Sequence, residues 1–310
     1  MKLINASGKN YEIGYKIGLE TSEEIKKVLK KNKRKFNKKI FNYCKKIFPE
    51  LIDELKGMAV GANVNFEELF ALNTGIDVGC TTIALKTKSR FIMGHNEDLS
   101  DNDVFLLRIT HESGVKSLSL CYYAFLPGFC VSMNSEGFIQ AMNGMVSIND
   151  GKKVGIPNSF LLRKTIESRT IDSAIDIFKK VNSLRGFSVI FCKEKLVLVE
   201  SCPEKIFISE QNILIHTNHY LFLKEFENRS CLINSVSRFS QAQTLINFVP
   251  KNFYGLKKIL SSHYDVPNNI CRHEKTRTAA TIIINSKKYM NVCYGNPCEN
   301  KFNKFFFDSF

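Results

Sequence analysis

Apolar residues recur at helical spacing through the first quarter of this 310-residue chain. The motif Thr-Ser-Glu-Glu at 21–24 has the pattern of a capping box in which the threonine is the cap, and apolar positions continue at helical intervals over 25–47. A proline then breaks this pattern and opens a second predicted helix over 49–60, which a glycine ends. A third, short helix is predicted to open at residue 65. Residues 1–79 are therefore predicted to be mostly helical.

From residue 80 the pattern changes to short segments typical of β-strands, separated by turn residues. Helical patterns interrupt the strands at 159–168, 171–181, 231–248 and 254–260. The predicted strands cover 81–85, 90–93, 105–111, 117–122, 138–142, 187–191, 196–200, 213–216, 278–285 and 289–294. Blocks of strands alternating with helices indicate an α+β fold in which helices cover antiparallel sheets. The boundary at 79/80 is a change of structural type rather than a linker.

Length and hydropathy narrow the class of protein further. A chain of this size forms one large domain or two small ones and is long enough to bury a sizeable core. No apolar stretch reaches the ~20 residues that a membrane helix needs. The segment 1–14 has no apolar run behind a basic patch, so we expect no secretory signal and a cytoplasmic protein.

Ten cysteines are scattered through the sequence without any C-x-x-C pair. They are Cys44, Cys80, Cys121, Cys130, Cys192, Cys202, Cys231, Cys271, Cys293 and Cys298. Without such a pair we expect no metal site of the zinc-finger type, and without a secretory signal we expect most of these cysteines to be reduced and buried. Cys298 is interpreted as structural.

The net charge of +14 is concentrated in one region, where eleven basic residues lie between Lys26 and Lys46. A basic run of this kind is compatible with binding to nucleic acid or to another anionic partner. It also fits a solvated helix face, which is the interpretation we favour. A nucleic-acid-binding protein that uses the Lys26–Lys46 segment is kept as the alternative from a different functional class.

Candidate chemistry centres on Gly79-Cys80, at the boundary between the two halves. A glycine before the cysteine leaves its carbonyl open to attack by the thiol, which would give a thioester through an N-to-S acyl shift. Hydrolysis of that thioester frees Cys80 as a new amino terminus. An α-amino group has a pKa of about 7.7–8.0, so near neutral pH it can serve as the base for its own thiol.

Asp98 ends the polar motif Gly-His-Asn-Glu-Asp, 18 residues after Cys80. A hairpin of this length returns Asp98 to the start of the strand that Cys80 opens. Its carboxylate would there hold the α-amino group and the thiol in register. The alternative role for Asp98 is that of a turn aspartate capping a strand end.

Several motifs together resemble the isopenicillin N acyltransferase family, and are similar to the related bile salt hydrolases and penicillin V acylases. The matching segments, in chain order, are Leu72-Asn73, Gly79-Cys80-Thr81-Thr82, Gly94-His95-Asn96-Glu97-Asp98, Pro127-Gly128-Phe129, Met133-Asn134-Ser135-Glu136-Gly137-Phe138 with Asn143 at its end, His216-Thr217-Asn218-His219, Ser235-Val236-Ser237-Arg238-Phe239 and Tyr294-Gly295-Asn296-Pro297-Cys298-Glu299-Asn300. Their common order along nearly the whole chain makes the combined signal much stronger than any single motif.

The resemblance implies a role for each matched site residue. Cys80 would be the nucleophile through its thiol and the base through its amine, and Asp98 would position that amine. Asn218, together with Asn143, would donate hydrogen bonds to the developing oxyanion, a contribution of about 3–4 kcal/mol per donor. Arg238 would polarise the thiol side of the site. On residue type alone, the asparagines fit turns and the arginine fits an exposed helix face.

The resemblance also implies the fold and the processing of the chain. The fold would be the four-layer αββα sandwich of N-terminal nucleophile hydrolases. Residues 1–79 would form a small chain and residues 80–310 the catalytic portion, packed as one domain and associated after cleavage. No cofactor or metal is implied, although a coenzyme A thioester is a possible acyl donor. One departure is His95, which stands where the hydrolases commonly carry an arginine.

Two further alternatives remain open at this stage. His216, His219 or His273 would serve a papain-like cysteine–histidine pair, although no local signature of that class surrounds any cysteine. The chain would otherwise be a catalytically inactive relative kept as a scaffold, which the full set of matched residues argues against. The substrate, which is a small-molecule amide or an acyl-coenzyme A, and the choice between hydrolysis and acyl transfer stay open.

Overall fold

Two β-sheets lie at the centre of the computed structural model, which describes residues 1–75, 79–88, 90–99, 104–228, 232–274 and 276–308. The strand order is β1-β4-β5-β6-β7-β8-β9-β10 in the eight-stranded sheet and β11-β2-β3-β12-β13-β14 in the six-stranded sheet. Strand β1 runs parallel to β4, and the other neighbouring pairs are antiparallel.

The eight-stranded sheet consists of β1 (Leu3–Gly8), β4 (Val104–His111), β5 (Lys116–Tyr122), β6 (Val131–Asn134), β7 (Ile139–Gly144), β8 (Phe187–Cys192), β9 (Leu196–Ser201) and β10 (Ile206–Glu210). The six-stranded sheet consists of β2 (Gly79–Lys86), β3 (Phe91–Leu99), β11 (Ile213–His216), β12 (Arg277–Ile284), β13 (Tyr289–Tyr294) and β14 (Phe302–Phe306). The helices are α1 (Asn10–Glu20), α2 (Ser22–Lys31), α3 (Lys38–Ile47), α4 (Pro49–Ala62), α5 (Phe66–Leu72), α6 (Asn158–Thr165), α7 (Ile171–Lys179), the short η1 (Lys224–Phe226), α8 (Ile233–Leu245) and α9 (Phe253–Leu260).

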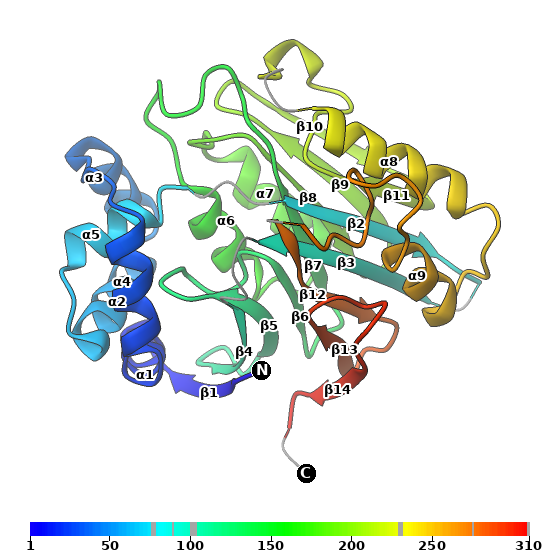
Figure 1. Cartoon of the computed structure of the whole chain (residues 1–310). Helices are drawn as coiled ribbons and strands as arrows, with labels where there is room; N and C mark the ends of the chain where they lie inside the picture. The colour runs from blue at the N-terminus through cyan, green and yellow to red at the C-terminus, as the bar shows by residue number, and fades with distance from the viewer. Residues whose placement is uncertain (76–78, 89, 100–103, 229–231, 275, 309–310) are drawn as a thin grey trace.

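Helices cover both outer faces of the paired sheets, so the molecule has four layers (Figure 1). One large apolar core joins α1 to α7 with the eight-stranded sheet and continues into the space between the sheets. A second apolar cluster lies between the six-stranded sheet and helices α8 and α9. Among the described residues, none of the helices is long and apolar enough to cross a membrane. The predicted α+β arrangement of helix-covered antiparallel sheets is therefore what the structure has.

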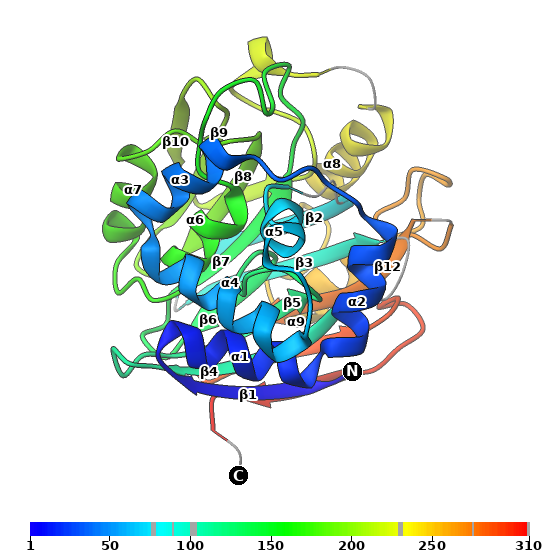
Figure 2. The same ribbon diagram turned by 90° about the vertical axis from the view of Figure 1, so that its left-hand side faces the viewer.

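The N-terminal segment is part of the same framework. Strand β1 is an edge strand of the eight-stranded sheet, and helix α1 lies directly beside α4 (Figure 2). The two helices approach so closely at Gly14 that a Cβ there would lie 1.9 Å from the Glu54 carbonyl oxygen. In the same region the buried guanidinium of Arg163, on α6, pairs with the buried carboxylate of Glu54 at 2.9 Å. Sheet pairing, helix packing and a buried ion pair thus all anchor residues 1–75.

The predicted helix over 25–47 is two helices, with non-helical residues at 32–37 between α2 and α3. A new helix starts at α3 because the Asn37 side chain accepts hydrogen bonds from the amides of Lys39 and Ile40. Thr21 is the N-cap residue of α2, as predicted, but its side chain makes no capping hydrogen bond, so no capping box forms. The Thr21 hydroxyl instead donates to the carbonyl of Ile17, at the end of helix α1.

Other boundaries differ for local reasons. Helix α4 continues through the predicted glycine stop to Ala62 and ends at Asn63, which adopts the left-handed conformation with φ of 53°. Helix α8 begins at Ile233, and Cys231, which opens the predicted helix, lies outside the described residues. Elements β1, α1, β6, β10 and β14 have no counterpart among the predicted segments.

Candidate active site

The β2–β3 hairpin sets the geometry of the site. Its register places Gly79 opposite Asp98 and Cys80 opposite Glu97. Because side chains alternate along a strand and directly opposed residues share a face, the thiol lies on the same face as Glu97, and Asp98 lies on the other face. We call the face toward the eight-stranded sheet the inner face and the face toward α8 and α9 the outer face. The prediction that the hairpin returns Asp98 to the start of the Cys80 strand is confirmed.

Cys80 is buried on the inner face, at the beginning of β2. Its sulfur lies 3.3 Å from Nδ2 of Asn218 and 3.5 Å from the Met142 carbonyl oxygen. Burial raises the pKa of the Cys80 thiol, and the nearby Glu97 charge raises it further. Asn218, the Gly144 amide and Arg238 act in the opposite direction, but burial has the larger effect. The thiol is therefore protonated at neutral pH and needs a base in order to react.

His95 and Glu97 form a buried pair beside the thiol. The Thr82 hydroxyl donates to Oδ1 of Asn143 at 2.7 Å, so the 2.8 Å contact between Thr82 and Nδ1 of His95 requires the ring nitrogen to donate. The other ring nitrogen, Nε2, lies 2.9 Å from Oε2 of Glu97, and one proton occupies that contact. The reactive atoms of Cys80, His95 and Glu97 lie within 4.8 Å of one another. This places a carboxylate–imidazole pair within reach of the thiol proton.

Asn218 contacts both the nitrogen and the sulfur of Cys80. Its Oδ1 accepts the Cys80 N–H at 3.0 Å, and its Nδ2 donates to the sulfur and, at 2.9 Å, to the carbonyl of Gly144. A 2.6 Å hydrogen bond from Arg238 to the same Oδ1 fixes which end of the amide faces the thiol. The Ser235 hydroxyl oxygen accepts the backbone N–H of Asn218 at 2.7 Å and holds its main chain. An N–H donor is therefore held beside the sulfur, where an oxyanion would form.

Arg238 reaches the site from helix α8, on the outer face. Its Nη1 donates to the Cys80 carbonyl oxygen at 2.6 Å and to the Thr81 hydroxyl at 2.8 Å. Burial lowers the pKa of this guanidinium, and the charge of Asp98 opposes the shift. A further bond, to Asn234 at 2.9 Å, braces the side chain within its own helix. Arg238 thus fixes the backbone that carries the thiol rather than touching the sulfur.

Asp98 lies beside the Gly79–Cys80 bond, on the outer face. Its Oδ1 accepts the Thr278 hydroxyl at 2.9 Å, and its Oδ2 is buried without a hydrogen-bond partner in the described part of the chain. Burial raises the pKa of Asp98, while the charges of Arg238 and Arg272 oppose that shift. A Cβ on Gly79 would lie 3.2 Å from the Asp98 Cβ and 3.4 Å from Nη1 of Arg272, so the close approach favours glycine.

Four of the five predicted site residues come together around the Gly79–Cys80 bond: Cys80, Asp98, Asn218 and Arg238. Asn143 lies on β7 between Met142 and Gly144, whose backbone groups contact the Cys80 sulfur, but its own side-chain amide accepts from Thr82 and donates to the His216 carbonyl at 3.4 Å. No hydrogen bond joins Asn143 to Cys80 among the described residues. Its predicted role at the oxyanion has no geometric support.

The geometry adds three groups that sequence reasoning did not assign: the Glu97 carboxylate, the Gly144 backbone amide and the Arg272 guanidinium. Only Glu97 had a signal in the sequence, because alternation within Gly94–Asp98 places it on the face of the thiol. A backbone amide has no sequence signature, and Arg272 belongs to a remote loop.

Two histidines of the papain-like alternative, His216 and His219, are engaged away from Cys80, and the third, His273, lies beside Cys271 and Cys298. Nε2 of His216 lies 3.0 Å from the Glu200 carboxylate, and Nδ1 of His219 lies 2.8 Å from the Ser235 hydroxyl. The imidazole next to Cys80 is instead that of His95. No disulfide is present among the described residues, and every described cysteine except Cys298 is buried, as predicted for most of them.

Comparisons with known proteins identify the family of this chain. A family model described as "Acyl-coenzyme A:6-aminopenicillanic acid acyl-transferase" matches residues 85–298. The chain is 25% identical over 217 residues to "Beta-alanyl-dopamine/carcinine hydrolase" of Drosophila melanogaster. The alignment covers 56% of this chain and 55% of that protein. It is 23% identical over 308 residues to "Acyl-coenzyme A:6-aminopenicillanic-acid-acyltransferase 40 kDa form" of Emericella nidulans. That alignment covers 88% of this chain and 85% of the relative.

A similar solved structure is a variant of conjugated bile acid hydrolase from Clostridium perfringens, with a TM-score of 0.50, 14% identity, and coverage of 74% of this chain and 97% of that one. This likeness confirms the α+β fold with two helix-covered sheets. The alignment with the Drosophila relative spans about half of that protein's length. Because the family model matches more than half of the residues, the chain belongs to the acyl-coenzyme A:6-aminopenicillanic acid acyl-transferase family, whose members are acyltransferases and amide hydrolases.

Proposed function

We propose that the chain cuts its own Gly79–Cys80 bond and then uses Cys80 as the nucleophile in acyl transfer from a small-molecule amide or thioester. The observation that carries this proposal is the double contact of Asn218 with Cys80. One amide accepts from the backbone nitrogen at 3.0 Å and donates to the sulfur at 3.3 Å. A single side chain thus orients both the atom that would become the amine and the atom that would attack.

Self-cleavage begins with transfer of the Cys80 thiol proton to the carboxylate of Glu97, its direct cross-strand neighbour. The sulfur attacks the carbonyl carbon of Gly79, a thioester forms, and the Gly79–Cys80 C–N bond breaks as the nitrogen takes up a proton. Water then hydrolyses the thioester, which leaves a carboxylate on Gly79 and a free thiol and amine on Cys80. Two observations support this step. Oε1 of Glu97 is buried and accepts no hydrogen bond from any described residue, so it is available to accept a proton. The residue before the nucleophile is a glycine, which leaves its carbonyl open to attack.

The same site then performs acyl transfer. The α-amine of Cys80, with a pKa of about 7.7–8.0 when unperturbed, takes the thiol proton, and the sulfur attacks the substrate carbonyl to form an acyl-enzyme. Nδ2 of Asn218 and the amide of Gly144 donate to the oxyanion. The leaving amine or thiol takes the proton, and water or an acceptor amine then removes the acyl group. Asp98 and Arg238 hold the new amino terminus from the outer face.

Residues 1–79 would remain bound as a small chain after cleavage. Strand β1 stays paired with β4, and the Glu54–Arg163 ion pair joins α4 to α6 across the cut. The shared apolar core adds a large hydrophobic contribution to this association.

The substrate class follows from the relatives' names and from the chemistry of the site. One relative is named as a hydrolase of β-alanyl-dopamine and carcinine, and another as an acyltransferase that uses acyl-coenzyme A. We therefore expect an acyl group that leaves from nitrogen, or from the sulfur of coenzyme A, without a resident cofactor. The basic residues between Lys26 and Lys46 are exposed, as expected for a solvated surface, and nucleic-acid binding stays the alternative. A cytoplasmic location also stays a prediction.

A trapping experiment tests this function. The processed protein is mixed with p-nitrophenyl phenylacetate, a generic acyl donor, quenched in acid and digested for mass spectrometry. We expect one acyl group on the peptide that begins with Cys80, and none in a Cys80→Ala variant. The Cys192→Ala variant is the matched control because Cys192 is buried on β8, away from the site. Acylation elsewhere, or of the uncut chain alone, contradicts the proposal.

A further inference from the structure

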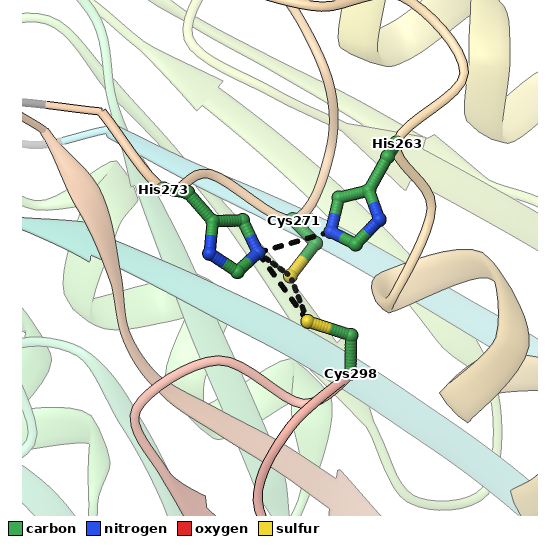
Figure 3. Close-up of side chains that lie close together, drawn as sticks. All are labelled: His263, Cys271, His273 and Cys298. Atoms are coloured by element: carbon green, nitrogen blue, oxygen red, sulfur yellow. Dashed lines mark hydrogen bonds between the residues drawn. The ribbon is translucent and has the colours of Figure 1, made fainter.

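A second cluster of reactive side chains lies at one end of strands β12, β13 and β14 of the six-stranded sheet. His263 follows helix α9, Cys271 and His273 precede strand β12, and Cys298 lies in the turn between β13 and β14. Figure 3 shows the two sulfurs and the two imidazole rings turned toward one common point. Their nearest ligand atoms all lie within 4.8 Å of one another. Residues up to 35 positions apart thus converge on a space about the size of one ion.

The distances within the cluster are those of a tetrahedral ligand shell. Nε2 of His273 lies 3.0 Å from Nε2 of His263, 3.6 Å from the sulfur of Cys271 and 3.3 Å from the sulfur of Cys298. The two sulfurs are 3.5 Å apart. Zinc bonds of about 2.3 Å to sulfur and about 2.0–2.1 Å to nitrogen place tetrahedral ligands ~3.3–3.8 Å from each other. These four separations agree with that geometry to within a few tenths of an ångström.

Hydrogen bonding alone does not satisfy this cluster. Nε2 of His273 faces three neighbours, the ring nitrogen of His263 and the sulfurs of Cys271 and Cys298. A ring nitrogen carries either one proton or one lone pair, so it satisfies only one of these contacts. A disulfide between the cysteines would need the sulfurs at about 2.05 Å and would leave both histidines without a shared role. A cation at the common point satisfies all four side chains together.

Outer contacts orient the ligands as they do around bound metals. The Glu299 carboxylate lies 3.6 Å from Nδ1 of His273, on the side of the ring away from the cluster. Asn296 donates to the sulfur of Cys271 at 3.4 Å and to the carbonyl oxygen of Arg272 at 2.6 Å. A carboxylate behind a ligating histidine and an N–H donor toward a ligating sulfur are typical outer-shell partners.

We propose that His263, Cys271, His273 and Cys298 bind one Zn²⁺ ion in a structural Cys2His2 site. Two thiolates and two imidazoles favour zinc over magnesium or calcium, and four protein ligands leave no open position for catalysis. The site lies outside the C-x-x-C patterns on which the expectation of no metal rests, because only Cys271 and His273 are close in sequence. It also gives roles to Cys298 and to His273, the one histidine of the papain-like alternative that lies beside cysteines.

The ion would connect this edge of the fold to the active site. Arg272 lies between two of the ligands in sequence, and its guanidinium lies beside Gly79 and faces Asp98. Zinc would therefore fix the loop that supplies this charge, and would fasten it to the turn after β13. Loss of the metal is expected to lower thermal stability first and processing at Gly79–Cys80 second.

Metal analysis of the full chain under reducing conditions tests the site. We expect about one zinc per chain after reconstitution and dialysis. After a chelator has removed the zinc, the protein should bind Co²⁺ and show the strong visible bands and the thiolate charge-transfer band of a tetrahedral thiolate site. Cys298→Ser is expected to weaken zinc binding at least tenfold, and Glu299→Gln by about tenfold as an outer-shell change. Cys202→Ser, at a buried cysteine far from the cluster, should keep full zinc content.

Three outcomes overturn the proposal. In the first, the wild-type chain stays metal-free in excess zinc. In the second, the bound cobalt gives the weak spectrum of an octahedral site. In the third, Cys271 and Cys298 form a disulfide that persists under reducing conditions. The Glu299→Gln variant keeps all four ligands, so its result does not depend on whether Cys298→Ser folds. The readout is independent of the proposed activity, because a Cys80→Ala variant should bind zinc as the wild type does.

Discussion

The two faces of the β2–β3 hairpin are formed by alternating residues of the same two strands, yet they carry different groups. The inner face carries Cys80, His95 and Glu97, whose reactive atoms lie within 4.8 Å of one another. The outer face carries Asp98, which Thr278 and the charges of Arg238 and Arg272 surround. The groups that would exchange protons in the proposed mechanism thus lie on one face, and the groups that hold the backbone lie on the other.

Asn218 joins the two faces at the bond that is proposed to be cut. Its Oδ1 takes hydrogen bonds from the Cys80 nitrogen and from Arg238, while its Nδ2 faces the sulfur. Inside a sheet the backbone N–H of a residue is normally used by the neighbouring strand, so it reaches a side chain where that pairing stops, and the β2–β11 pairing stops at Thr82. The position of Cys80, second in β2, meets that condition. The comparison teaches that register, rather than the identity of any one residue, separates chemistry from support.

The largest effect is expected from Cys80→Ala, which removes the inner-face nucleophile. Self-cleavage and acyl-enzyme formation should both be lost completely, because no other described thiol lies beside Asn218. Denaturing gel electrophoresis and the trapping assay measure the two losses. Cys192→Ala should be processed normally, and any residual cleavage at residue 79/80 in Cys80→Ala contradicts the assignment.

Glu97→Gln sharpens the comparison on the inner face. Replacing the carboxylate by an amide keeps the shape and removes the proton acceptor, so self-cleavage should slow by about 10²–10⁴-fold. The rate of appearance of the small chain after synthesis in a cell-free system measures this effect. Acyl transfer by already processed protein should change much less, because the α-amine then serves as the base. Equal losses in both steps would mean that Glu97 supports the structure only.

Asn218→Ala removes the residue that connects the faces. Loss of one oxyanion donor is expected to lower kcat by about 10²–10³-fold. Asn143→Ala is the matched comparison, and because the Asn143 amide is engaged by Thr82 and His216, we expect a clearly smaller loss. Steady-state kinetics on the processed forms measure both. A larger effect at Asn143 would return the oxyanion role to that residue.

Asp98→Asn tests the outer face and should have the smallest effect. Burial raises the pKa of Asp98 above its ordinary value near 3.9, so this carboxylate takes up a proton at a higher pH than an exposed aspartate. Activity should therefore fall as the pH drops through that raised pKa. In Asp98→Asn the neutral-pH rate should drop by about tenfold or less, and this acidic limb should disappear from the pH–rate profile. An unchanged limb would assign it to another group.

Sequence reasoning predicted ten of the fourteen described strands because they alternate or are continuously apolar, but it predicted no element over 3–20. Helix α1 buries Ile13, Gly14, Ile17 and Gly18, and its two glycines give the close α1–α4 approach while they weaken the apolar periodicity. Strand β10 is a sheet edge with only partial burial, so its alternation is weak.

The structure brings together four of the five predicted site residues, whereas sequence reasoning missed the neighbours that only tertiary structure supplies. Cys80, Asp98, Asn218 and Arg238 come from four separate segments that the fold brings to one bond. The direct neighbour of Cys80 across the hairpin is nevertheless Glu97. A loop residue such as Arg272 gains its place only through loop conformation, which periodicity and spacing do not encode.

The most direct test of the central claim is the intact mass of the purified wild-type protein under denaturing, reducing conditions, with sequencing of every amino terminus. We predict two chains that co-purify, one ending at Gly79 and the other beginning at Cys80. A single 310-residue chain that persists for days at neutral pH would leave Cys80 without a free amine and would contradict the account.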